Sequence, residues 1–499
     1  MKRIMVLEYL RHAFLVMLMM WVALLASAEL SAGVAKVKIS TDEPLVTVNG
    51  HISEGVAHDI YARALTLYDG QKRLVFITYD LNCLDVATPY LRVRLRDELG
   101  IDPKYLLLLA THNHNAPIQI VPENFEYGKW LAEIMFDLVK EAIANERGPV
   151  KLEFGNGNGY FVMSTGNAPT DYEIQVLKVS HDEKPIALLF NQGTHPLQAS
   201  VAKIDPGHPG FAMDLIEERW PGVQAMYADQ CGGNQFPGDR NAYRKQMMEA
   251  RKKGPEFVDE WMEKRARALA EQLADKTLEI ATANLVEISG TITSSMERFD
   301  LPLAEPMSYD EAKKMYAEVR ERRGIPEDVG FVPYPSDYRD TNWMRMLLRY
   351  HEEGIPFPKT TGDMVCTDDT YLVHNEDKEF LKKYEDSIHD ELPCVYNEVI
   401  VAKIGPMPIV AIQGEVCAPI GMRIKDAFRR ERPLLIFGYM GEHNLYIPTR
   451  EIVRLDAYQA QTLRIQYASP VGWDPSVEDV TVKGVTRMVR DIIEETEGQ

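Results

Sequence analysis

Two histidines two residues apart stand directly after a strongly apolar segment of the sequence. Residues 105–111 (YLLLLAT) form this segment, and His112 and His114 follow it. In an extended chain, residues i and i+2 face the same side, so both imidazoles can reach one point. Such a pair suits a zinc site, with one or both imidazoles as ligands. The alternative is a pair of loop histidines held by polar partners.

Two further candidates for chemistry also follow apolar segments. His195 comes after IALLFN (186–191), and Glu415 closes the segment IQGE (412–415). A carboxylate at the end of a strand can ligate a metal ion or act as a base. Taken singly, one loop histidine is weak evidence for a site, and a lone glutamate is most often solvated.

Residues 229–239 (DQCGGNQFPGD) form a glycine-rich turn. Its glycines permit positive φ angles and close backbone approach. The successive amides of Gly232, Gly233, Asn234 and Gln235 could therefore cradle an anion or an oxyanion. No GK[ST] follows, as a Walker loop would require, and the chain has no G-x-S-x-G of a serine hydrolase.

The elements expected around these motifs alternate between strands and helices. Strands are predicted at 59–69, 73–81, 105–111, 150–155, 173–180, 186–191, 223–228, 396–404, 408–413 and 434–439, and helices at 86–99, 129–146 and 209–219. Asp69-Gly70 predicts a hairpin turn between the first two strands. The pattern indicates an α/β fold, with a mixed sheet core and flanking helices. The motifs fall at strand ends, where such sheets build their sites.

Residues 243–282 predict one long charged helix, and residues 303–392 are rich in charge, proline and tyrosine. No Gly/Ser-rich linker isolates this part of the chain. We therefore expect a charged helical insertion, in which 243–395 is a helical and irregular elaboration on one domain that spans 29–499.

The first residues of the chain are typical of a targeting segment. Basic residues precede the apolar run 13–28, which ends in a small-x-small signature. This pattern predicts a signal peptide over 1–28, cleaved near Ala28, and an exported protein, periplasmic or secreted. An uncleaved anchor is the alternative, although the run is shorter than the about 20 residues of a membrane span. Export would permit a disulfide, for which Cys366 and Cys394 are the expected pair.

The composition is that of an ordinary globular protein, with 45% hydrophobic and 26% charged residues. The formal net charge of −20 argues against a nucleic-acid partner, because phosphate binding needs a basic surface. It also disfavours simple electrostatic docking on an anionic membrane.

The order and spacing of five motifs resemble the neutral/alkaline non-lysosomal ceramidase family, in its N-terminal catalytic domain. The family's T-H-T-H-S-G-P matches THNHNAP (111–117), and its A-I-H-P-like segment matches GTHP (193–196). Its G-D-V-S-P loop matches GNQFP (233–237), and its P-G-E stretch matches QGE (413–415). Its final G-Y-x-N-x-Y-x-x-Y-[VL]-x-T run matches GYMGEHNLYIPT (438–449). The resemblance runs from about residue 45 to about residue 455 and implies the fold of that family.

The resemblance also implies one Zn²⁺ per chain, held by His112, His195, Glu415 and Tyr446. It implies that His114 polarises an amide carbonyl, with Tyr446 also counted among the catalytic groups. His443 replaces a tyrosine of the family, as an extra ligand or an acid. The implied reaction is hydrolysis of an N-acyl sphingoid base to a fatty acid and an amine. Zinc suits it, because bound zinc polarises a carbonyl and lowers the pKa of water to about 7.

This sequence departs from the family pattern at the glycine-rich loop. Phe236 stands where the family has a proposed active-site serine, and Asn234 stands where it has an aspartate. Zinc-activated water could attack directly, with the loop amides as oxyanion donors. The chain also ends shortly after the last motif, so we expect no C-terminal β-sandwich domain.

We therefore expect a secreted zinc amidohydrolase that acts on an N-acyl sphingoid base or a related small-molecule or lipid amide. Peripheral contact with a membrane or lipid aggregates would accompany a lipid substrate. The alternatives are a non-catalytic metal- or ligand-binding homologue and a zinc esterase on the same fold.

Overall fold

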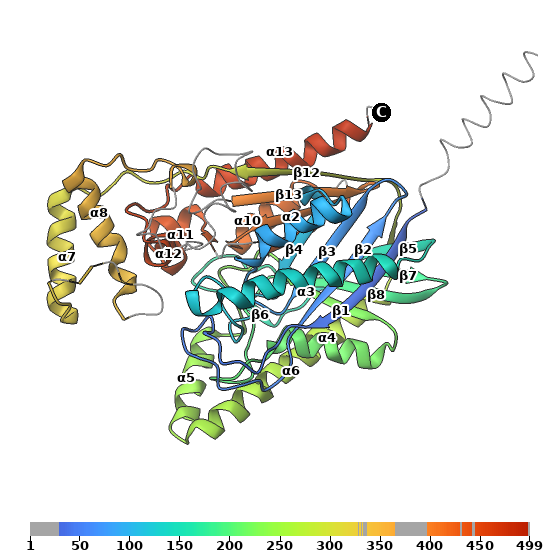
Figure 1. The fold of residues 1–499 in the computed structure, drawn as a ribbon, viewed down its shortest axis with the longest axis horizontal. Helices are drawn as coiled ribbons and strands as arrows, with labels where there is room; N and C mark the ends of the chain where they lie inside the picture. The colour runs from blue at the N-terminus through green and yellow to red at the C-terminus, as the bar shows by residue number, and fades with distance from the viewer. Residues whose placement is uncertain are drawn as a thin grey trace, which may run out of the picture.

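Two β-sheets pack face to face, and helices cover their outer faces (Figure 1). The computed structural model describes residues 29–327, 329–330, 332, 337–364, 397–429, 432–441 and 445–497. Within them the predicted α/β class, a mixed sheet core with flanking helices, is confirmed. The predicted signal peptide, His443 and the expected Cys366–Cys394 pair lie outside the described residues.

The larger sheet has eight strands. Their spatial order is β1 (Ser31–Lys38), β2 (Tyr61–Tyr68), β3 (Arg73–Tyr79), β4 (Leu106–Ala110), β16 (Leu435–Met440), β14 (Met407–Gln413), β13 (Asn397–Ile404) and β12 (Ile292–Phe299). Neighbouring strands are antiparallel, except that β3 runs parallel to β4 and β14 runs parallel to β16. The predicted hairpin at Asp69-Gly70 joins β2 to β3.

The smaller sheet has five strands. Their order is β11 (Val286–Ile288), β5 (Val150–Asn158), β7 (Glu173–His181), β8 (Lys184–Gln192) and β9 (Gln224–Asp229). Only the β8–β9 pair in this sheet is parallel. Two short pairs complete the strands: β6 (Val162–Ser164) with β10 (Gln235–Pro237), and β15 (Glu415–Val416) with β17 (Tyr446–Ile447).

The position of strand β4 explains the almost continuous apolar run at residues 105–111. Leu106 and Leu108 join the core beneath the helices, whereas Leu107 and Leu109 join the core between the two sheets. All five residues of β4 are buried, because the strand is covered on both faces. The run 105–111 therefore places the following histidines at the end of a rigid central strand.

The helices lie mostly outside the sheets. The larger sheet is covered by α2 (Ala87–Leu99), α3 (Phe125–Ala144), α10 (Ala418–Asp426) and α13 (Val477–Glu497), and the smaller one by α4 (Gly207–Arg219) and α6 (Pro255–Ala281). The remaining helices are α5 (Arg240–Arg251), α7 (Tyr309–Arg323), α8 (Asn342–Glu353), α11 (Arg450–Arg454) and α12 (Tyr458–Tyr467), with 3₁₀ turns at Pro103–Tyr105, Pro122–Asn124, Arg339–Thr341 and Thr361–Asp363.

Within the described residues, no helix is long and apolar enough to cross a membrane.

The predictions for the charged insertion need correction in two places. The single helix expected at 243–282 is two helices, because Gly254 adopts a φ of 118° and Pro255 then begins α6. The segment 243–395 is also more than a helical and irregular elaboration, since it supplies an edge strand, β11 or β12, to each sheet.

A buried ion-pair cluster fastens this edge to the core. Glu398 of β13 pairs with Arg92 of α2, at 3.0 Å from Oε2 to Nη1, and with Arg298 of β12, at 3.3 Å. Burial opposes the ionisation of Glu398, but the two guanidinium groups outweigh it and lower its pKa to about 2.

Candidate metal centre

The predicted site residues lie at the ends of strands from both sheets. His112 follows β4 and His195 follows β8, while Glu415 and Tyr446 open the short strands after β14 and β16. Strands β4, β16 and β14 are neighbours in the larger sheet. Glu415 pairs directly with Tyr446 in the parallel β15–β17 bridge. Residues more than 300 positions apart in the sequence are thereby brought to one point.

The side chains converge closely. Oε2 of Glu415 lies 3.2 Å from Nε2 of His112 and 3.2 Å from Nε2 of His195. Nε2 of His112 is 3.1 Å from Nε2 of His114, and Nε2 of His195 is 3.0 Å from the Tyr446 hydroxyl. The ligand atoms of the three histidines all lie within 4.8 Å of one another. This histidine cluster could hold a metal ion.

Hydrogen bonds orient two of the imidazoles toward the centre. Nδ1 of His195 donates to the carbonyl oxygen of Gln235 at 3.0 Å, which leaves the lone pair on Nε2 free. Nδ1 of His112 lies 2.9 Å from the side-chain amide of Asn82. His112 also has a φ of 55°, which is uncommon for a residue with a side chain and is typical of functional sites.

Sequence reasoning missed Asn82. It comes directly after an apolar strand, β3, as the predicted site residues do after theirs. The same signal could have found it.

The electrostatics of the cluster favour a cation. Burial lowers the pKa values of His112 and His114, which favours the neutral imidazoles that a metal ion needs as ligands. Burial opposes the ionisation of Glu415, but His112 and His195 outweigh it and lower its pKa to about 2. Oε2 of Glu415 nevertheless accepts no well-aligned hydrogen bond from the described residues.

A buried carboxylate oxygen without a hydrogen-bond partner, surrounded by imidazole nitrogens, is a fitting environment for a metal ion. Burial raises the pKa of Tyr446 well above its ordinary value, so without a metal its hydroxyl is protonated.

The glycine-rich loop packs tightly behind the ligands. A Cβ atom on Gly233 would lie 2.4 Å from the carbonyl oxygen of Glu415, and one on Gly232 would lie 2.5 Å from the backbone of Gly193. Both distances are shorter than real Cβ contacts. The two glycines therefore allow the loop to approach the segments that carry Glu415 and His195.

Two amides of this loop are already used within the fold. The amide of Gly233 donates to the carbonyl of Val416 at 2.9 Å, and that of Gln235 donates to the carbonyl of Gly232 at 2.8 Å. The anion cradle expected over 232–235 therefore cannot be built from these two amides as they stand. The first bond fixes the loop against the segment that carries Glu415, and the second closes a turn within the loop.

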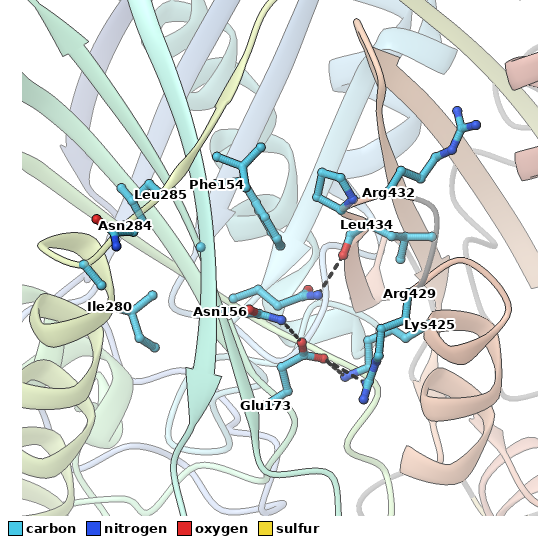
Figure 2. Close-up of a pocket in the computed structure, with 15 residues that line it drawn as sticks. Phe154, Asn156, Glu173, Ile280, Asn284, Leu285, Lys425, Arg429, Arg432 and Leu434 are labelled. Carbon is cyan, nitrogen blue, oxygen red and sulfur yellow. Dashed lines mark hydrogen bonds and ion pairs between the residues drawn. The ribbon is translucent and has the colours of Figure 1, made fainter.

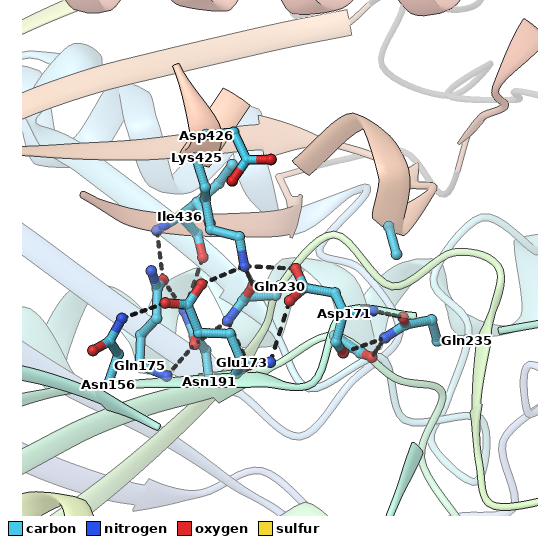
Figure 3. Close-up of polar contacts among 12 residues, drawn as sticks. Asn156, Asp171, Glu173, Gln175, Asn191, Gln230, Gln235, Lys425, Asp426 and Ile436 are labelled. Carbon is cyan, nitrogen blue, oxygen red and sulfur yellow. Dashed lines mark hydrogen bonds and ion pairs between the residues drawn. The ribbon is translucent and has the colours of Figure 1, made fainter. Parts of the chain in front are cut away.

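An ion-pair cluster behind the loop was also missed by sequence reasoning. The buried Lys425 of α10 lies 2.5 Å from Asp171 and 2.6 Å from Glu173 (Figure 3). The side chain of Gln235 joins it, accepting from the amide of Asp171 at 2.6 Å and donating to its carbonyl at 3.1 Å. Gln235 in turn holds His195, so the cluster is linked to a candidate ligand.

A small cavity opens beside the metal cluster. It has a volume of about 150 Å³, and His114, His195 and Tyr446 line part of it. Phe236, which the motif comparison aligned with the family's serine, lines it as well. Three of the predicted site residues therefore border a cavity, while His112 and Glu415 contact them from behind.

A second cavity, of about 400 Å³, is lined in part by residues of the ion-pair cluster (Figure 2). Glu173 and Lys425 line it, together with Asn156 and Arg429. Its central charges already pair with each other, and none of the candidate metal ligands reaches it. Of these two cavities, the smaller one therefore borders the candidate metal ligands.

No protein-family model matches the chain, and no curated protein sequence gives a significant match. Two solved structures share its fold. Neutral ceramidase from Pseudomonas aeruginosa aligns with a TM-score of 0.66 at 16% identity, over 94% of this chain and 75% of that one. A ceramidase complexed with C2 aligns with a TM-score of 0.64 at 15% identity, over 94% and 76% of the two chains.

The chain therefore has a ceramidase-like α/β fold. The resemblance predicted from the five motifs is confirmed at the level of the fold, in a divergent form.

Proposed function

We propose that this protein is a zinc-dependent amidohydrolase that cleaves the C–N bond of an N-acyl compound. The observation that carries the proposal is the convergence of His112, His195, Glu415 and Tyr446 beside a cavity, on a ceramidase-like fold. Two histidines and a glutamate form a ligand set of known catalytic zinc sites, and such sites keep an open position. Tyr446 would complete the set.

Zinc bound by these residues would supply Lewis acidity to the amide carbonyl and to water. In the hydrolysis, the water oxygen bonds to the carbonyl carbon and the C–N bond breaks. The nitrogen takes up a proton and leaves as an amine, and the acyl group leaves as a carboxylic acid. His114 lines the cavity as a neutral imidazole, so its N–H can donate a hydrogen bond to the carbonyl oxygen.

The proposed mechanism needs no serine nucleophile. Phe236 packs edge-on against Tyr243, with ring centroids 5.1 Å apart, and offers no proton or nucleophile. Attack by water is therefore the route that the residues around the cavity support. We further propose that the enzyme acts after export, as its N-terminal sequence predicts.

The direct test is release of a carboxylic acid from a panel of amides by the purified protein. The panel holds a short-chain fluorescent ceramide and N-acetylated amines. We expect release that a chelator abolishes and added zinc restores. His181→Ala is a matched control for His195→Ala, because His181 lies at the opposite end of β7 from the site. Bound zinc without release from any amide would favour a binding protein instead.

A further inference from the structure

Among the described residues, one arginine lines the cavity beside the histidine cluster. Arg240, the first residue of α5, is exposed and shares this cavity with His114, His195 and Tyr446. No ion pair joins it to a carboxylate of the described residues. The guanidinium carbon lies 6.0 Å from the centroid of the Phe236 ring, a contact that leaves its charge available to a ligand. The guanidinium can receive an anionic group from a ligand.

The cavity also offers an unused hydrogen-bond donor. Asn234 lines it and is only 1% exposed. Its Oδ1 accepts from the amide of Ala418 at 2.8 Å, which fixes the orientation of the side chain. Its Nδ2 has no partner among the described residues. Because leaving a buried donor unsatisfied is costly, this NH₂ group is suited to a ligand oxygen.

Most of the other described residues around the cavity have polar side chains. These residues are Thr165, Gln198, Gln235, Tyr458 and Gln459. Apolar side chains come from Phe236 and Pro196. The volume of about 150 Å³ is below the about 300–1,000 Å³ of pockets for drug-sized ligands. A long alkyl chain would not fit in this volume, whereas a compact ligand with polar groups would be well matched.

We infer that the substrate is a small N-acyl compound that carries a carboxylate, such as an N-acylamino acid. Arg240 binds the carboxylate, and Nδ2 of Asn234 donates to an oxygen of the same ligand. This inference deepens the proposed function and rests on it for the bond that is cleaved. The carboxylate recognition itself concerns binding, so it can be tested separately.

The test compares N-acetylleucine with N-acetylisopentylamine, which has the same skeleton without the carboxylate. Wild-type protein, Arg240→Gln and Arg244→Gln are loaded with zinc and assayed on both. Arg244 is the matched control, an exposed arginine one turn along α5 that does not line the cavity. A monoamide of succinic acid is assayed beside its neutral analogue. This comparison tests whether the protein recognises a carboxylate on the acyl side of the amide instead.

We expect wild type and Arg244→Gln to prefer a carboxylate substrate by at least about tenfold in kcat/KM, the factor that one charge-assisted hydrogen bond supplies. Arg240→Gln should lose this preference through a raised KM. Hydrolysis that ignores the carboxylate, or a preference that survives Arg240→Gln, would overturn the inference and leave the proposed function standing.

Calorimetric titration of the zinc-loaded proteins with N-acetylleucine distinguishes a failure of the carboxylate site from a failure of the proposed function. If no amide is hydrolysed, the proposed function fails. Binding that is weakened about tenfold in Arg240→Gln but not in Arg244→Gln would still support the carboxylate site. Equal binding by all three proteins, or binding by none, would refute it.

Discussion

Replacing Gly233 with alanine should damage the metal centre without touching any ligand side chain. The new Cβ would lie 2.4 Å from the carbonyl oxygen of Glu415, whereas ordinary van der Waals contact begins at 3.4 Å. The loop and the Glu415 strand must therefore separate by about 1 Å. Both are backbone segments, so no flexible side chain can absorb the displacement.

This displacement sets the expected magnitudes. Overpacking of this kind costs about 1–3 kcal/mol of stability. Metal–ligand distances vary by only about 0.2 Å between working sites, so a shift of Glu415 by about 1 Å should weaken zinc binding roughly 100-fold. This factor is the upper end of the loss in metal affinity seen when residues that support the ligands are mutated.

Zinc affinity is measured by competition with a chromophoric chelator, and stability is measured by urea denaturation of the metal-free protein. Gly472→Ala is the control, because its Cβ would meet only the side chain of Arg464, at 3.9 Å. We expect the control to match wild type in both measurements. Wild-type zinc affinity in Gly233→Ala would refute the role given to this glycine.

Three further predictions concern charge and chemistry. Glu398 has a folded-state pKa of about 2 against an ordinary 4.5, so its ion pairs contribute about 3 kcal/mol of stability above pH 4.5, and this contribution is lost as the pH falls toward 2. Denaturation of the wild type between pH 6 and 2.5 should show this decline in stability. An equal decline in Glu398→Gln would contradict the prediction. Lys425→Met removes the buried cation between Asp171 and Glu173 and leaves Glu173 only the more distant Arg429, at 3.7 Å. Urea denaturation should therefore show a loss of about 3–5 kcal/mol, and a loss below 1 kcal/mol would count against the cluster. His114→Ala should retain zinc but lose at least about 100-fold in kcat, and loss of the zinc instead would make His114 a ligand.

Much of the core could be predicted from local sequence. The apolar run at β4 and the hairpin at Asp69-Gly70 depend on residues close in the chain. The strand-end rule also selected His112, His195 and Glu415 before any distance was known, because a sheet gathers its strand ends at one edge.

The parts that escaped prediction depend on distant partners. Nothing near Lys425 in the sequence indicates that two acidic residues about 250 positions away surround it. Arg240 lies just before the charged segment 243–282, and no local pattern distinguishes it as a residue of the site. The break between α5 and α6 is different, since Gly254-Pro255 was a local signal that the prediction of one continuous helix overlooked.

The zinc content of the purified protein and its histidine variants tests the central claim most directly. Elemental analysis of wild type, His112→Ala, His195→Ala and the His181→Ala control should give about one zinc per chain in wild type and in the control. The two ligand variants should lose most of it. Near-stoichiometric zinc in His112→Ala and His195→Ala, or none in wild type, would contradict the metal centre and the amidohydrolase built on it.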